Sequence, residues 1–270
     1  CKEMVKYGAK VLGGCCGTTP AYVAKLKEMV ATVNASVVKK KPRQLAVCTP
    51  LKTVVVDQPR IVGERINPTG KKRFKQALRD NDMNYILSQA IEQIDAGADI
   101  LDVNVGSPDI DEKEMMVRVI KALQAIVDVP LQIDSTKPEV LEAALRVYNG
   151  KPIVNSVNGE EEVLDTILPI VAKYGGAVIG LALDENGIPP TAEGRVEIAK
   201  RIRDKAMSYG IPKEDIIIDC LTLTVSAEQK AAAETLKAMN IVKNELGLRT
   251  VLGVSNISFG LPNREIINKT

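Results

Sequence analysis

Short apolar runs alternate with longer amphipathic segments from residue 61 to the end of the chain. Each run is rich in Val, Ile and Leu, as are parallel strands that are buried on both faces of a sheet. The runs recur about every 30 to 40 residues, which is the size of a strand–helix–strand unit. Seven strands are predicted in this way, near residues 62, 100, 131, 153, 178, 216 and 251. The pattern therefore predicts an α/β fold with a parallel sheet.

Most of these runs end on, or are followed by, an Asp or an Asn. The residues concerned are Asn67, Asp102, Asn104, Asp134, Asn155, Asp219 and Asn256. The carboxyl ends of parallel strands meet at one rim, where TIM-type barrels keep their active sites. The alternative, an open doubly wound sheet, predicts a Gly-rich phosphate loop, and the sequence has no G-x-G-x-x-G or Walker pattern. We therefore predict a TIM-type (β/α)8 barrel.

Seven strands leave such a barrel one strand short. We expect the last strand and its helix to lie beyond Thr270. The chain also begins with Cys1 rather than Met, which indicates a fragment of a longer protein.

The residues before the barrel have a different pattern. A helical tail is followed by a predicted short strand at residues 9–12, and a helix is predicted over about residues 21–33. Thr19 and Pro20 are typical N-cap and N1 residues for the start of that helix.

Three regions are predicted along the chain. Residues 1–41 form an N-terminal remnant of another domain, and residues 61–270 form the barrel. Between them, residues 42–60 carry scattered Pro and Thr and are predicted to be a linker with one short strand near residues 53–56.

Composition excludes several classes of function. The 36 Lys and Arg nearly balance the 34 Asp and Glu, so no strong field favours nucleic acid or an anionic membrane. Aromatic residues make up 3% of the chain, which is too few for base-stacking platforms. There is no membrane-length apolar run and no signal peptide, and the five cysteines are an odd number. These features favour a cytoplasmic protein with reduced thiols.

The candidate chemistry lies in four strand-end residues: Asp134, Asn155, Asp219 and Asn256. Carboxylates accept hydrogen bonds, and primary amides both donate and accept them, so this set suits a ligand with alternating donors and acceptors. The same residue types also cap helices and tie loops together, and that interpretation stays open for each of them. The chain contains no histidine, so imidazole chemistry is excluded.

Five ordered motifs resemble a known family. They are Gly63-Glu64-Arg65-Ile66-Asn67-Pro68-Thr69-Gly70, Asp102-Val103-Asn104-Val105-Gly106, Ile133-Asp134-Ser135-Thr136, Val154-Asn155-Ser156 and Gly253-Val254-Ser255-Asn256. Together they resemble the pterin-binding domain of methyltetrahydrofolate methyltransferases. This family includes the corrinoid/iron–sulfur-protein methyltransferase and the folate module of cobalamin-dependent methionine synthase. The resemblance covers roughly residues 61–270.

The resemblance implies a TIM-type barrel that binds methyltetrahydrofolate in its mouth and passes the methyl group to a cobalamin carried on another domain or protein. It implies pterin contacts at Asn67, Asp134, Asn155 and Asp219, with Arg264 as a further binding residue. It implies that Asn256 donates a hydrogen bond to N5 as that atom takes a proton from solvent. Asp102 and Asn104 are expected to order the mouth from behind the ligand-contacting residues.

The sequence Gly13-Gly14-Cys15-Cys16-Gly17 resembles the end of the homocysteine-binding domain of methionine synthases. There two adjacent cysteinates and a distant third hold Zn²⁺, which activates homocysteine as its thiolate. The third ligand is expected upstream of this chain, because neither Cys48 nor Cys220 is a natural replacement. We therefore expect Cys15 and Cys16 to be metal ligands only in the complete domain.

Three alternatives remain at this stage. One is a monofunctional methyltetrahydrofolate:corrinoid-protein methyltransferase, and another is an inactive folate-binding fragment. The third is dihydropteroate synthase, which shares the pterin site. It is disfavoured because its Lys/Ser/Arg cluster for a diphosphate is missing at the last strands, and because of the double cysteine.

Overall fold

The computed structural model describes residues 1–33, 43–226, 228 and 230–269 of the chain. It divides into two compact units, Cys1–Arg43 and Gln44–Thr270. The predicted boundary between residues 41 and 42 lies outside the described residues.

The first unit contains two helices, α1 (Lys2–Lys6) and α2 (Pro20–Ala31). The hydroxyl of Thr19 accepts a hydrogen bond from the Tyr22 amide at 3.3 Å, which confirms the predicted helix start. The predicted strand at residues 9–12 is wrong, because these residues form no strand. A strand needs a partner, and the described part of this unit supplies none. Val5 is its one buried residue among those described, so this unit has almost no core of its own.

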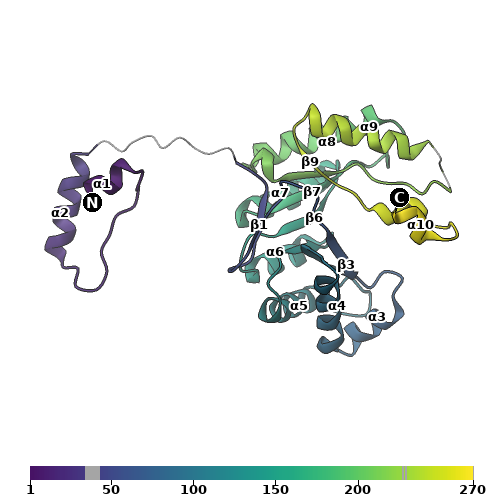
Figure 1. Ribbon diagram of the computed structural model, residues 1–270, viewed down its shortest axis with the longest axis horizontal. Coiled ribbons are helices and arrows are strands. Elements are labelled where there is room, and N and C mark those ends of the chain that lie inside the picture. The colour runs from purple at the N-terminus through teal and green to yellow at the C-terminus, as the bar shows by residue number, and fades with distance from the viewer. Residues whose placement is uncertain (34–42, 227, 229, 270) are drawn as a thin grey trace. The chain divides into compact units, whose positions relative to one another are not determined.

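The second unit is built on seven parallel strands that pair in sequence order (Figure 1). They are β3 (Val62–Ile66), β4 (Ile100–Val103), β5 (Leu131–Asp134), β6 (Ile153–Val157), β7 (Ala177–Leu181), β8 (Ile216–Asp219) and β9 (Arg249–Val251). All seven predicted strands are confirmed, and the sheet curls into a half-barrel of the α/β class. The strands β3 and β9 are the edges of this described sheet, and the eighth strand stays a prediction.

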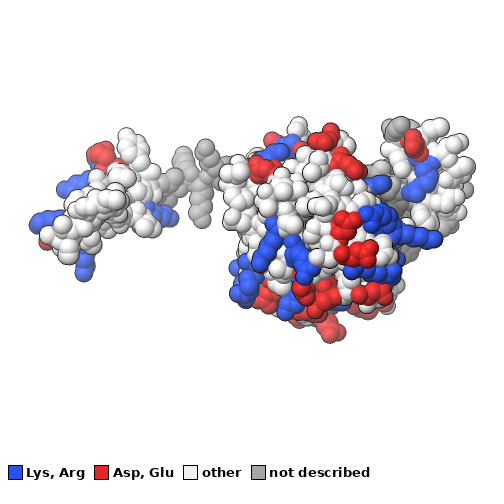
Figure 2. All heavy atoms as spheres, turned by 90° about the horizontal axis from the view of Figure 1, so that it is seen from below, with Lys and Arg blue, Asp and Glu red and all other residues white. Residues whose placement is uncertain are grey.

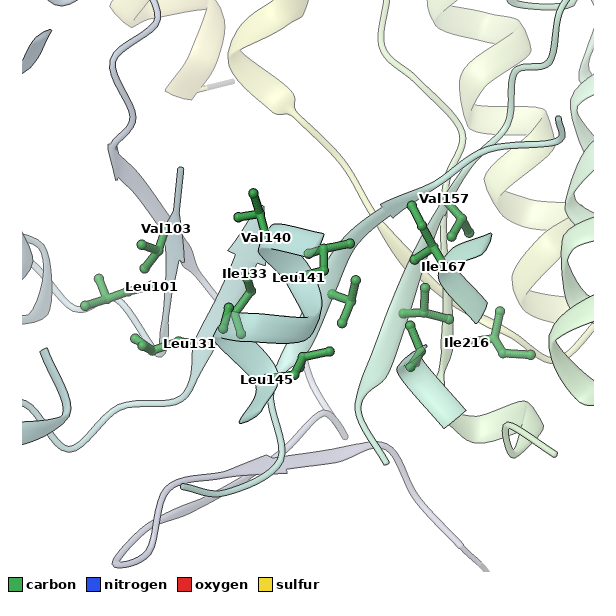
Figure 3. Packing of buried hydrophobic residues seen from close by; sticks show 14 of the residues in the cluster. Leu101, Val103, Leu131, Ile133, Val140, Leu141, Leu145, Val157, Ile167 and Ile216 are labelled. Carbon is green, nitrogen blue, oxygen red and sulfur yellow. The ribbon is translucent and has the colours of Figure 1, made fainter. Parts of the chain in front are cut away.

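Helices connect the strands and cover the outer face of the sheet (Figures 1 and 3). They are α3 (Lys72–Arg79), α4 (Met83–Asp95), α5 (Glu112–Ile126), α6 (Pro138–Val147), α7 (Glu161–Tyr174), α8 (Ala192–Ser208) and α9 (Ala231–Asn244). Short 3-10 turns occur at η1 (Lys213–Asp215) and η2 (Val254–Ser258), and the last helix is α10 (Arg264–Lys269).

Side chains alternate between the two faces of each strand, as the pleat requires. In β8, Ile216 and Ile218 belong to the core between sheet and helices, whereas Ile217 belongs to a second core inside the curl. Figure 3 shows the outer core, where Leu141 and Leu145 of α6 pack near Ile133 of β5. Both faces of the inner strands β4 to β8 are therefore largely buried, which explains why these strands read as apolar runs.

A hairpin fills the amino-terminal end of the curl. Its strands β1 (Ala46–Cys48) and β2 (Thr53–Val55) pair antiparallel, and Leu45, Val47 and Val54 are buried in the inner core. The prediction of a linker with one strand is therefore wrong for residues 44–60. Burial of these three apolar side chains makes the segment part of the second unit.

Tyr148 fastens this hairpin to the barrel. Its hydroxyl donates to the carbonyl oxygen of Cys48 at 3.0 Å and accepts from the amide of Leu131 at 3.2 Å. Burial raises the pKa of the Tyr148 hydroxyl to about 12, so the group keeps its proton and can serve as donor.

Among the described residues, no helix combines the length and the apolar composition that crossing a membrane requires.

We expect Tyr148→Phe to lower the free energy of unfolding by about 1–3 kcal/mol, because it leaves the buried Leu131 amide unpaired and removes one of the two hydrogen bonds that the Cys48 carbonyl accepts. Urea unfolding followed by circular dichroism measures this change. The control is Tyr209→Phe, which removes an exposed hydroxyl bonded to Asp165 and should change stability by no more than about 0.5 kcal/mol. Equal effects of the two variants would contradict the role assigned to Tyr148.

Candidate functional site

The carboxyl ends of the strands bring three of the predicted residues to one rim. Asp134 and Asn155 are register partners on the neighbouring strands β5 and β6. Asp219 ends β8, where it pairs in register with Leu181 of β7. Because the strands are parallel and adjacent, residues from distant parts of the sequence face one mouth.

Asp102 lies beneath this rim and is 2% exposed. Its Oδ1 accepts hydrogen bonds from Nε2 of Gln132 at 2.6 Å and from Nδ2 of Asn155 at 3.2 Å. The bond to Asn155 uses the amide nitrogen, so the amide oxygen is the group left for a ligand.

Gln132 is a member of this network that the sequence analysis missed. The available signal was a polar residue in the middle of the apolar run Leu131-Gln132-Ile133. Its side chain is buried, and its Oε1 has no hydrogen-bond partner among the described residues.

Asn104 supports Asp134 in a similar way. Its Nδ2 donates to Oδ2 of Asp134 at 2.9 Å, and its Oδ1 accepts from the Gly106 amide at 2.9 Å. The amide of Asn104 is therefore fixed at both ends, and the second oxygen of Asp134 remains for a ligand. The supporting role of Asp102 and Asn104 in ligand binding stays a prediction.

The mouth is acidic. Burial and the nearby charge of Asp134 raise the pKa of Asp102 to about 7. The pKa of Asp134 is also raised, chiefly by burial and further by the charges of Glu64 and Glu112, against the lowering effect of the Asn104 hydrogen bond. Neither glutamate is among the site residues predicted from the sequence. Crowded acceptors favour a ligand that donates hydrogen bonds.

Asp219 has one carboxylate oxygen without a hydrogen-bond partner among the described residues. Its Oδ1 accepts from the Leu221 amide at 2.8 Å, and burial raises the pKa of this carboxyl. Asn67 is also nearly buried, and its Oδ1 accepts from the Thr69 amide at 2.8 Å. The nitrogen of Asn67 is thus a hydrogen-bond donor beside the acceptors of the rim.

The structure does not join Asn256 to this set. Asn256 lies in η2 and is exposed, and no hydrogen bond of its side chain occurs within the described part of the chain. The guanidinium of Arg264 donates to Ser258 Oγ at 3.1 Å and to the Ser255 carbonyl at 2.9 Å, so it fastens α10 to η2. The ligand contacts predicted for these two residues stay predictions.

Cys15 and Cys16 are exposed free thiols in the first unit. In the described ranges, no group of three His, Cys, Asp or Glu side chains is arranged to hold a metal. Zinc sites use at least three protein ligands, so two adjacent thiols do not form a site alone. Cys48 lies in the hairpin and Cys220 is buried at the end of β8, where burial raises its thiol pKa to about 12.

Charges of both signs are interspersed on the face shown in Figure 2. The view contains no broad basic surface of the kind that binds nucleic acid.

The acidity of the mouth predicts a pH effect on stability. The pKa of Asp102 is raised in the folded state. At low pH the buried carboxyl is protonated and its burial costs no stability, whereas stability is lost as pH rises through about 7. Asp102→Asn keeps an oxygen that can accept from Gln132 and Asn155 but removes the charge. We expect its stability relative to wild type to increase by on the order of 1–2 kcal/mol between about pH 5 and about pH 8.

Urea unfolding at the two pH values measures this difference. Asp204→Asn, which alters an exposed carboxylate, is the control and should show no such trend. A pH-independent difference between Asp102→Asn and wild type would show that the buried carboxyl titrates normally.

Two different protein families match the two units of the chain. The family model described as pterin binding enzyme matches residues 63–268, and the model described as homocysteine S-methyltransferase matches residues 1–30. The methionine synthase of Mycobacterium leprae is 34% identical over 285 residues, and that of Mycobacterium tuberculosis is 33% identical over 280 residues. Each alignment covers 98% of this chain but 24% of the relative, so the chain spans about a quarter of their length.

Solved structures of dihydropteroate synthases share the fold. A Xanthomonas albilineans enzyme aligns with a TM-score of 0.61 at 21% identity, covering 84% of this chain and 85% of that one. The Thermus thermophilus enzyme aligns with a TM-score of 0.59 at 22% identity, covering 83% and 85%. At such identities the likeness shows the TIM-type fold alone. The family match over most of the barrel shows that this chain belongs to the pterin-binding enzymes.

Proposed function

We propose that this chain is the folate module of a methionine-synthase-type methyltransferase. In this proposal the barrel binds 5-methyltetrahydrofolate and transfers its N5-methyl group to cob(I)alamin, as a step in making methionine from homocysteine. The observation that carries it is the buried network in which Asp102 and Asn104 hold Asn155 and Asp134. Similarity to methionine synthases along nearly the whole chain supports it.

The hydrogen-bonding groups of the mouth match the edge of a pterin. Asp219 would take the N3–H and the 2-amino group, which are adjacent donors, through the oxygen that does not bind the Leu221 amide. Asp134 and Asn155 offer further oxygens for the remaining ring N–H groups, and Asn67 offers a nitrogen for an acceptor. A ligand of this kind also offsets the repulsion among the buried carboxyls.

The reaction explains why an amide is proposed at position 256. In the proposed reaction the C–N bond would break with its electron pair left on N5, the methyl group would pass to the cob(I)alamin acceptor, and N5 would gain a proton to give tetrahydrofolate. An amine leaves poorly unless it is hydrogen-bonded or protonated as the bond breaks. Asn256 would donate that hydrogen bond, and the proton would come from solvent, since the chain has no histidine.

The first unit is proposed to be the end of a homocysteine-binding domain. Cys15 and Cys16 would hold Zn²⁺ only together with a third cysteinate that this chain does not supply. The cobalamin is proposed to be carried by another domain or protein, in the cytoplasm. A monofunctional corrinoid-protein methyltransferase and an inactive folate-binding fragment are the alternatives that the experiments below test.

Replacing Asp219 by Asn should weaken binding of 5-methyltetrahydrofolate by about 100-fold or more. The Leu221 amide will hold the amide oxygen, so the NH₂ group will face the donors of the ligand. Isothermal titration calorimetry measures the affinity, and Asp204→Asn is the control with an unchanged value. Equal affinity in Asp219→Asn would contradict the assigned pterin edge, and no saturable binding by folded wild type would overturn the proposed function.

Asn256→Ala should lower the rate of methyl transfer to free cob(I)alamin by about 10²–10³-fold, while the folate affinity changes by less than about fivefold. The visible spectrum of the corrin follows the transfer. Asn268→Ala, an exposed residue of α10, is the control. Folate binding by wild type without any methyl transfer would identify a binding module rather than an enzyme.

A further inference from the structure

Arg195 is the largest fully buried side chain in the described chain. It lies near the start of α8 and is 1% exposed. No ion pair involves it in the described ranges, although burying an unpaired charge is expensive. A buried cation at this position therefore indicates a role other than packing.

Within the residues that the structure describes, its hydrogen bonds go to neutral oxygens. Its Nε donates to the Pro189 carbonyl at 2.9 Å, which ties it to the loop after β7. Its Nη1 donates to the carbonyl of Cys220 at 2.9 Å and of Leu221 at 3.1 Å. The same nitrogen donates to Thr235 Oγ1 of α9 at 2.7 Å. Arg195 thus joins two rim loops and two helices.

The carbonyls that Arg195 holds belong to the two residues directly after Asp219. Leu221 has a φ of 61°, in the left-handed region that branched and bulky side chains rarely occupy. That conformation directs the Leu221 amide to Oδ1 of Asp219 at 2.8 Å. The unfavourable backbone is therefore coupled to the orientation of the carboxylate, and such backbone persists only where the surroundings enforce it.

Thr235 completes the clamp. Its hydroxyl lies 3.0 Å from the Leu221 carbonyl oxygen and 2.9 Å from the Ala231 carbonyl oxygen, and it accepts from Arg195. Thr235 is 2% exposed, so these bonds form away from water, where they constrain geometry most strongly.

We propose that Arg195, together with Thr235, is a positioning residue that fixes the Asp219 carboxylate for the pterin edge. The proposal rests on the proposed function, because the orientation of Asp219 matters for binding only if Asp219 contacts the folate. Arg195 itself touches no ligand. It enforces the Leu221 conformation, which leaves one oxygen of Asp219 bound to the protein and one free for the ligand.

The test measures 5-methyltetrahydrofolate affinity by calorimetry on the full chain, with unfolding free energies measured in parallel. The first pair is Thr235→Val, which keeps the side-chain shape but removes the hydroxyl, and Thr235→Ser, which keeps the hydroxyl but removes a methyl group. We expect Thr235→Val to bind at least about fivefold more weakly and Thr235→Ser to bind as wild type does. Arg195→Met should bind at least about tenfold more weakly if it folds.

Ile202→Val is the stability control, because it removes a buried methyl group from the same helix without touching the loop. It should lower stability and leave the affinity unchanged. The proposal is overturned if the affinity of Thr235→Val equals that of wild type, or if affinity follows stability across all variants. Failure of wild type to bind folate would instead overturn the proposed function on which this inference rests.

Discussion

The parallel register of the seven strands is the constraint on which the site depends. Register pairing of Asp134 with Asn155, and of Asp102 with Gln132, places two polar layers one above the other at the carboxyl end of the sheet. Because the side-chain period of a strand is two, a slip of one residue would send these groups into the apolar core. The two cores, one beneath the helices and one around the hairpin, oppose such a slip.

The buried carboxyls of the site lower the stability of the barrel at a place where a bound ligand could offset this effect. Asp102, Asp134 and Asp219 are all buried enough for their pKa values to be raised. Amide side chains and backbone amides offset only part of this cost. In the proposed function, a donor-rich ligand would supply the remaining hydrogen bonds, so the same buried carboxyls that destabilise the free barrel would favour its complex.

The strand ends around the mouth are held by different kinds of contact. The Asp102 and Asn104 networks fix the β4, β5 and β6 ends through side chains, whereas the β8 end is fixed through backbone carbonyls held by Arg195. Asn256 belongs to η2, which accepts hydrogen bonds from Arg264 of α10 and, at the Ile257 carbonyl, from the Val225 amide at 3.1 Å. In the proposed function, recognition of the ring and assistance to the leaving nitrogen would thus belong to parts of the barrel that are held in different ways.

The sequence by itself determined the class of fold, the seven strands and the strand-end polar residues. These follow from local patterns: buried parallel strands must be apolar throughout, and a polar residue at the end of each marks the rim. The motif resemblance then identified the family, which the comparisons confirmed. The double cysteine likewise indicated the second family, which matches the first residues.

Only the tertiary structure decided which polar groups are partners and which segments belong together. The hairpin was predicted to be a linker because its few apolar residues show no pattern of their own. They become core residues only by packing against Ile153 and Ile217 inside the curl. Residues 9–12 read as a strand because local propensity cannot tell whether a pairing partner exists. The role of Arg195 could not be predicted for a similar reason. It depends on carbonyl groups 25 and 26 residues away in sequence, which only folding brings to its guanidinium.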